Sequence, residues 1–261
     1  MISELDYMGA KMKYFVSSDI HGYYDEWMKA LGENGFDEKN PEHKLIVCGD
    51  LFDRGSQPNE VQTFVMDMLA KDKIILIRGN HEDLATSLVD SRGYIGLDSD
   101  YDVNGTLQTL MDLLNLDKNF VLQCVSEFRR RAKNTDYISK IIPSMKNYYE
   151  TEHYVFVHAW LPLSDTEYAL CENWREASDT SWEEARWLEP IEAYKGGLTL
   201  KDKTQVCGHR SSSIFWANAY PNKYAIAGEN ACYKPFINKE VIALDGCTYY
   251  SKKVNVVVLE D

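Results

Sequence analysis

The sequence predicts a protein of the α/β class, in which a βαβαβ unit is followed by a helical stretch and then by a part rich in strands. Short apolar runs at residues 14–17, 44–48 and 74–77 alternate with segments of helical periodicity. This alternation is typical of parallel strands that are joined by crossover helices. Further strands are expected at the apolar runs of residues 154–157, 204–207, 241–244 and 254–259.

Two amphipathic helices are expected to connect the first three strands. In the first, apolar residues recur at the helical spacing i, i+3, i+4 and i+7, namely at Tyr24, Trp27, Met28 and Leu31. The second shows the same periodicity at Val61, Phe64, Val65, Met68 and Leu69. Residues 84–150 are predicted to be mostly helical, and residues 1–12 form an N-terminal arm or extension ahead of the first strand.

Composition and charge exclude several classes of protein. The 261 residues include 28 Lys and Arg against 41 Asp and Glu, a formal net charge of −13. Such a charge disfavours sequence-independent binding to duplex nucleic acid. No apolar run approaches the ~20 residues of a membrane span, and the acidic N-terminal segment is unlike a signal peptide. With six scattered cysteines and no CxxC pair, we expect a cytoplasmic protein with reduced cysteines in its core.

Residues of the types that bind metals follow each of the first three predicted strands. Asp19 and His21 follow the first strand, and Asp50 follows the second. Asn80 and His81 follow the third. Because the carboxyl ends of parallel strands share one edge of a sheet, we expect these side chains to converge in space.

Two later predicted strands end in the same way, with His158 after YVFV and His209 after TQVCG. Imidazole, carboxylate and amide ligands without thiolate suit Mn, Fe, Zn or Ni, and their number exceeds what one ion needs. Two ions about 3.5 to 4 Å apart, bridged by a carboxylate, would use this set and generate hydroxide for attack on phosphorus. The residues alone therefore indicate two-metal hydrolysis of a phosphoester.

Each of these segments also has a structural explanation when it is taken alone. Asp19 and Asn80 could each cap a helix, and residues 50–55 could form an ordinary polar loop. His158 and His209 could be hydrogen-bonded core residues. Their joint occurrence at five predicted strand ends favours a functional site.

The segments SDIHG, GDLFDRG, RGNHE, VHAW and CGHR resemble the five signature motifs of the calcineurin-like metallophosphoesterases. The forms GDxxDRG and GNHE resemble the phosphoprotein phosphatase branch, with its protein Ser/Thr phosphatases, phage lambda phosphatase and bacterial symmetrical diadenosine tetraphosphatases. The resemblance spans residues 13–261. It implies a four-layer αββα sandwich of two mixed β-sheets flanked by helices, in a single domain of residues 1–261 with a helical insertion at 84–150.

The resemblance also implies a binuclear metal centre. Its ligands would be Asp19, His21, Asp50, Asn80, His158 and His209. The first two would bind one ion, Asp50 would bridge both, and the other three would complete the second site. Manganese is the expected metal, with Fe, Zn and Ni as alternatives.

The catalytic groups follow from the same resemblance. His81 would protonate the leaving oxygen while Asp53 orients its ring, and Arg54 would bind the phosphoryl oxygens. A hydroxide that bridges the metals would attack, without a covalent phosphoenzyme. Family members carry a second phosphate-binding arginine, for which Arg175 and Arg186 both qualify; the local pattern Trp-x-x-Ala-Arg-Trp favours Arg186.

Three functions are compatible with these residues. The leading one is a phosphomonoesterase of the Ser/Thr protein phosphatase type, and the alternative is a symmetrical diadenosine tetraphosphatase or another nucleotide phosphohydrolase. The third is a metal-stabilised binding module without catalysis, which the presence of Asp50, Asp53, Arg54 and His81 disfavours. The expected partner is a phosphorylated protein, peptide or nucleotide, with neither membrane nor duplex nucleic acid. The oligomeric state is not indicated.

Overall fold

The structure is a computed structural model that describes residues 11–92, 99–164 and 166–261. Its first sheet has four strands in the order β3-β2-β1-β9, in which β9 is antiparallel to β1 and the others are parallel. The strands are β1 (Lys13–Ser17), β2 (His43–Cys48), β3 (Ile74–Ile77) and β9 (Val257–Glu260). Helices α1 (Tyr24–Glu33) and α2 (Pro58–Ala70) connect the parallel strands, as the periodicity predicts.

The second sheet has five strands in the order β4-β5-β6-β8-β7. They are β4 (Tyr149–Glu150), β5 (Tyr154–Phe156), β6 (Thr204–Cys207), β8 (Val241–Ala243) and β7 (Phe236–Ile237). The three central strands are parallel, and the two edge strands are antiparallel to their neighbours. Each edge strand has only two residues, too few for a periodic pattern, so the sequence does not predict them.

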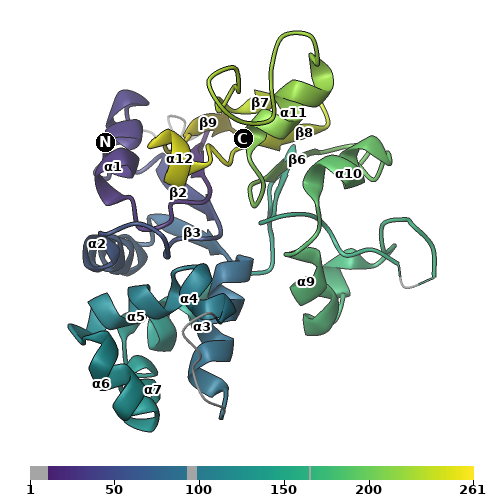
Figure 1. Cartoon of the computed structure of the whole chain (residues 1–261). Coiled ribbons are helices and arrows are strands. Elements are labelled where there is room, and N and C mark those ends of the chain that lie inside the picture. The colour runs from purple at the N-terminus through teal and green to yellow at the C-terminus, as the bar shows by residue number, and fades with distance from the viewer. Residues whose placement is uncertain (1–10, 93–98, 165) are drawn as a thin grey trace.

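The two sheets pack face to face and helices cover their outer sides, which gives four layers (Figure 1). The side chains of β1 alternate between these layers. Phe15 lies in the cluster beneath α1 and α2, whereas Tyr14 and Val16 point into the space between the sheets. There they share a cluster with Phe156 and Val206 of the second sheet. The predicted αββα sandwich of two mixed sheets is confirmed.

Between β3 and β4 the described residues are mostly helical, as predicted for residues 84–150, although residues 93–98 of that prediction lie outside the described part and residues 149–150 belong to β4. Its helices are α3 (Asn80–Asp90), α4 (Asp100–Val103), α5 (Thr106–Leu114), α6 (Lys118–Gln123), α7 (Val125–Ala132), a π-helical turn (Tyr137–Ile141) and α8 (Ile142–Ser144). Leu107, Val121 and Phe128 from this stretch join the same hydrophobic cluster as α1 and α2. The helical stretch is therefore packed against the first sheet.

The outer side of the second sheet carries α9 (Asp179–Ala185), α10 (Pro190–Lys195) and α11 (Ser212–Ala219). A short 3₁₀ turn (Trp174–Glu176) precedes them, and α12 (Thr248–Ser251) follows β8. The predicted strand at residues 254–259 begins only at Val257 and ends at Glu260; before it, the side chain of Asn255 donates to the carbonyls of Tyr233 and Leu244.

Two further expectations concern the environment of the chain. Among the described helices, none is both long and apolar enough to cross a membrane. Of the cysteines, Cys48 and Cys207 lie in the core, whereas Cys124 is exposed. The expectation that all six are core residues is therefore wrong for Cys124, and Cys171, Cys232 and Cys247 are only half-buried.

We expect Trp27→Ala to lower the free energy of unfolding by about 3–5 kcal/mol, the usual cost of emptying a large core site. Trp27 is fully buried, packs edge-on against Phe64, and donates its indole N–H to Ser17 at 3.1 Å. Urea unfolding measures the change, with Val103→Ala as the exposed control. Equal stability of the two variants would contradict this account of the first core.

Candidate metal centre

The ends of five parallel strands meet at one edge of the sandwich. β1, β2 and β3 of the first sheet and β5 and β6 of the second contribute the loops. Hydrogen bonds join the two sheets there, from the ring of His158 to the carbonyl of Cys48 and from the amide of His209 to the carboxylate of Asp19. The structure thus brings together nine predicted site residues, namely Asp19, His21, Asp50, Asp53, Arg54, Asn80, His81, His158 and His209.

Many of the site residues in these loops have a left-handed backbone conformation. The φ angles are positive, between 52° and 75°, at Asp19, His21, Asp50, Asp53, Arg54 and His209. Such angles are uncommon for residues other than glycine and concentrate at functional sites. Gly49 also has a positive φ of 83°, and a Cβ there would collide with the ring of His158 and the backbone of Gly79. Glycine is therefore required at the turn before Asp50.

A buried glutamate ties two of these loops together. Glu82 is completely buried, and its carboxylate accepts hydrogen bonds from the amides of Gly79 at 2.7 Å, Asp50 at 3.1 Å and Leu51 at 3.1 Å. The carboxylate of Asp50 in turn accepts the amide of His81 at 3.1 Å. The end of β2 and the start of α3 are thereby held in one arrangement.

Two of the imidazoles are oriented by backbone carbonyls. The Nδ1–H of His21 donates to the carbonyl of Phe52 at 2.9 Å, and that of His158 donates to the carbonyl of Cys48 at 2.8 Å. Because a carbonyl only accepts, Nε2 of each ring is left with its lone pair toward the cluster. This fixed tautomer is the usual arrangement of histidines that bind metals.

The ligand atoms form two groups that share Asp50. One group of possible ligand atoms contains His21, Asp50 and His81, the other Asp50, His158 and His209, and within each group the atoms lie within 4.8 Å of one another. His81 is expected to be the acid and not a ligand, and its ring is bound to Asp53, so the first ion would rely on His21, Asp50 and the nearby Asp19. The carboxylate of Asp19 lies 3.9 Å from Nε2 of His21 at the side of the first group. Two ligand groups with a common carboxylate are what a pair of divalent ions requires.

The chemistry of this cluster fits cations. Nε2 of His158 lies 2.8 Å from the amide oxygen of Asn80 and 3.5 Å from the carboxylate of Asp50, so three acceptors face one another. His209 has one ring nitrogen 3.0 Å from the same amide oxygen, and its Nε2 is buried without a hydrogen-bond partner among the described residues. Acceptors in such proximity repel unless a cation lies among them.

Burial lowers the pKa of the candidate histidine ligands and raises the pKa of the candidate aspartate ligands. It lowers the pKa of His158 to about 3 and that of His209 to about 2, so both imidazoles are neutral, as metal ligands must be. Burial, followed by the charge of a neighbouring aspartate, raises the pKa of both Asp19 and Asp50 well above the usual range. Two buried carboxylates close together favour bound positive charge.

A second hydrogen-bonded chain lies beside the ligands. Nδ1 of His81 is 2.7 Å from the carboxylate of Asp53, which also accepts the hydroxyl of Thr106 at 2.6 Å. Nε2 of His81 lies 3.2 Å from the guanidinium of Arg54, whose side chain is exposed. Thr109 accepts the amide of Asp53 at 3.0 Å. Helix α5 of the helical stretch therefore holds Asp53 in place, and Asp53 in turn orients the ring of His81.

Several of these contacts lie beyond what the sequence analysis identifies. Glu82 fits the pattern of an ordinary residue in a first helical turn, and Thr106 lies within a helix without a motif. Asp245 directly follows the predicted strand at residues 241–244, so the rule that polar residues follow strands could have found it. It is buried, and burial raises its pKa to about 6. Two residues on, Cys247 donates its amide to it at 2.6 Å.

The two candidate second arginines are both engaged in ion pairs. Arg186 is buried and donates to Asp83 at 2.6 and 3.1 Å and to Asn147 at 3.0 Å. Arg175 donates to Glu150 at 2.6 and 2.8 Å on the surface. The contact of Arg186 with a phosphoryl group stays a prediction, one that requires this buried pair to open.

The sandwich and its two overlapping groups of buried ligands define a metal-dependent phosphoesterase. The chain belongs to the calcineurin-like phosphoesterase family, whose model matches residues 12–231. The resemblance that the five sequence motifs carry is therefore confirmed.

Matches to individual curated proteins cover a shorter part of the chain than the family model does. The chain is 38% identical over 76 residues to the asymmetrical bis(5'-nucleosyl)-tetraphosphatase PrpE of Bacillus velezensis, a match of 27% of this chain and 30% of that protein. It is 36% identical over 69 residues to the symmetrical bis(5'-nucleosyl)-tetraphosphatase of Buchnera aphidicola, 26% of this chain and 23% of that one. The matched segments thus span less than a third of either curated relative.

A solved structure resembles nearly the whole chain. The cold-active protein-tyrosine phosphatase of a psychrophilic Shewanella superposes with a TM-score of 0.55 at 16% identity, covering 96% of this chain and 76% of that one. At this identity the likeness concerns the fold alone. The fold is shared among proteins with different substrates, so it does not decide the substrate here.

Because Asp50 belongs to both ligand groups, we expect Asp50→Asn to lose both ions and His209→Ala to lose one. The wild-type protein is stripped of metal, dialysed against Mn²⁺ and assayed for metal content beside the variants. His43→Gln, at a histidine that belongs to none of the candidate ligand groups in the described part of the chain, is the control and should retain both ions. Two ions retained in Asp50→Asn would show that Asp50 is not the shared ligand.

Proposed function

We propose that this chain hydrolyses a phosphoanhydride bond of a dinucleoside polyphosphate with the help of two divalent ions, for which Mn²⁺ is our first choice. The single observation that carries the two-ion reaction is the position of Asp50 in both ligand groups. The substrate class is supported by the curated relatives from Bacillus and Buchnera, whose names specify nucleosyl-tetraphosphatases. Whether cleavage is symmetrical is read from the products.

The proposed roles follow from the side chains at the site. Asp19, His21, Asp50, Asn80, His158 and His209 would hold the ions. When bound, these ions supply the charge that activates water for attack on phosphorus. The exposed guanidinium of Arg54, 3.2 Å from His81, would bind phosphoryl oxygens.

His81 is proposed to donate the proton that the leaving oxygen needs. Its Nδ1–H is held by Asp53 at 2.7 Å, so Nε2 is the atom that would carry the proton for transfer. In this structure Nε2 accepts from the guanidinium of Arg54 at 3.2 Å, and this contact would have to open before Nε2 takes up the proton. A carboxylate behind the ring stabilises the imidazolium before transfer and keeps the ring in place. The intact Asp53–His81 pair disfavours the non-catalytic binding module.

A protein phosphatase is the second candidate, and the observation that favours it is the form of two sequence motifs. GDLFDRG and RGNHE, at residues 49–55 and 78–82, have the long forms that resemble the phosphoprotein phosphatase branch. The exposed Arg54 is accessible to a phosphorylated side chain. The reaction centre would serve either substrate, because both present a phosphoryl group to the same ligands.

Turnover by metal-stripped protein, reloaded with Mn²⁺, distinguishes the two candidates. Diadenosine tetraphosphate is compared with phosphoserine and phosphothreonine peptides, and products are separated by ion-exchange chromatography. We expect a higher kcat/KM for the dinucleotide, with two ADP from symmetrical or AMP and ATP from asymmetrical cleavage. A higher kcat/KM for the peptides would overturn the proposal in favour of the phosphatase.

We expect Thr106→Val to lower kcat by about 10-fold with little change in KM, a part of the 10²–10⁴-fold that a positioned acid contributes. The valine keeps the shape of Thr106 but removes the hydroxyl that donates to Asp53. Thr106→Ser should restore kcat, and Thr63→Val, on the exposed side of α2, should leave it unchanged. Equal kcat in the valine and serine variants would exclude this positioning role.

A further inference from the structure

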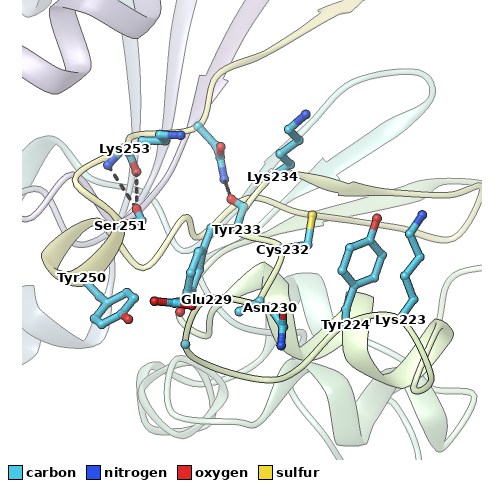
Figure 2. Close-up of a pocket in the computed structure, with 13 residues that line it drawn as sticks. Lys223, Tyr224, Glu229, Asn230, Cys232, Tyr233, Lys234, Tyr250, Ser251 and Lys253 are labelled. Carbon is cyan, nitrogen blue, oxygen red and sulfur yellow. Dashed lines mark hydrogen bonds between the residues drawn. The ribbon is translucent and has the colours of Figure 1, made fainter.

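A cavity of about 840 Å³ lies between the segment of residues 223–234 and the segment of residues 250–255 (Figure 2). Its volume is within the range of sites for small molecules, about 300–1,000 Å³. It lies outside the ligand cluster described above, and its lining includes none of the proposed metal ligands or catalytic residues.

The cavity is connected to the metal centre through α12. At the start of this helix, the hydroxyl of Thr248 donates to the carbonyl of Asp19 at 2.9 Å. Two residues on, Tyr250 lines the cavity. Asn255 forms another part of its wall and binds the carbonyls of Tyr233 and Leu244 at 2.8 Å each. The cavity wall is therefore built on the same strand end and helix that contact a proposed metal ligand.

Aromatic rings supply the apolar surface of the cavity. The rings of Tyr233 and Tyr250 lie 5.7 Å apart at 47°, and Tyr250 is 59% exposed, so a face of its ring is open to a ligand. Tyr224 lines the cavity farther along the same loop (Figure 2). Open tyrosine faces can stack against flat, π-rich groups such as nucleic-acid bases.

Lysines supply the charge. Lys223, Lys234 and Lys253 line the cavity, and no carboxylate in the described part of the chain forms an ion pair with any of them. Three lysines against the single carboxylate of Glu229 make this cavity a local positive site in a chain with a net charge of −13, and the ammonium of Lys223 lies over the ring of Tyr224 at 4.9 Å. Asn230 and Glu229 add an amide and a carboxylate that can hydrogen-bond the edge of a base.

We propose that this cavity binds one nucleoside of a dinucleoside polyphosphate, with the base on Tyr250 and Tyr233 and the lysines near its phosphates. The polyphosphate chain would run along α12 toward the metal centre. This inference rests on the proposed function for its substrate, but it concerns a site away from the reacting atoms. It gives the chain a means of preferring a nucleotide over a phosphopeptide.

Binding is tested with metal-free protein, so that the reaction centre does not contribute. AMP and inorganic phosphate are titrated into the full chain by calorimetry. We expect AMP to bind, and Tyr250→Ala to weaken it about 10-fold, the effect of removing a stacking partner. Tyr249→Ala is the matched control, because Tyr249 is the equally exposed neighbour that does not line the cavity. Unchanged AMP affinity in Tyr250→Ala, or phosphate binding as tight as AMP, would overturn the proposal.

A kinetic test then separates this proposal from the proposed function. The kcat/KM for diadenosine tetraphosphate is divided by that for p-nitrophenyl phosphate, which has no nucleoside. We expect this ratio to fall about 10-fold in Tyr250→Ala and Lys253→Gln, but not in Tyr249→Ala or the exposed Lys239→Gln. If the ratio is equal in all variants and the wild type still cleaves the dinucleotide, nucleoside binding in the cavity is ruled out and the proposed function stands.

The opposite result is also distinguishable. If wild type cleaves p-nitrophenyl phosphate but not the dinucleotide, the proposed function fails, while AMP binding that depends on Tyr250 would still establish a nucleoside site. Tyr250→Phe keeps the ring and should retain AMP affinity. Loss of AMP affinity in this variant as well would contradict stacking, and its thermal midpoint shows whether the chain has folded.

Discussion

The metal centre depends on the buried carboxylate of Glu82. At the ends of β2 and β3 the chain leaves the sheet, so the amides of Gly79, Asp50 and Leu51 lose their ladder partners inside the protein. Glu82 accepts all three. A buried charge without hydrogen bonds would be costly, but three donors offset much of that cost and fix the two loops relative to each other. Asp50 and the start of α3 can then share one set of ligands.

The same loops hold strain and repulsion that the rest of the molecule must balance. Left-handed backbone at Asp19, Asp50 and His209, and acceptors of Asn80 and His158 only 2.8 Å apart, would be unfavourable in isolation. The two sheets anchor the loops through three hydrophobic clusters, one between the sheets and one beneath each helical layer. A rigid sandwich can therefore present a preorganised group of ligands whose mutual repulsion a bound cation would relieve.

The proposed reaction and the proposed substrate selection use different parts of this architecture. The candidate ligands and the His81–Asp53 pair lie at strand ends, where, as proposed, they would act on a phosphoryl group whatever molecule carries it. Other segments of the chain surround these residues. Thr106 of the helical stretch donates to Asp53, and the loop of residues 223–234 lines the cavity beside α12. Such additions can change the substrate while the metal centre stays the same.

Features that repeat at short range could be predicted from the amino-acid sequence. Alternating apolar runs predicted β1, β2, β3, β5, β6 and β8, and residues that follow these strands, such as Asp19 and His158, predicted the ligand cluster. The partners that these residues contact depend on how the segments pack in three dimensions. The bonds from Thr248 to Asp19 and from Thr106 to Asp53 join residues far apart in the chain, and Arg186 pairs with Asp83 on another element. Periodicity reports how one segment faces the core, whereas such contacts depend on how several segments pack together.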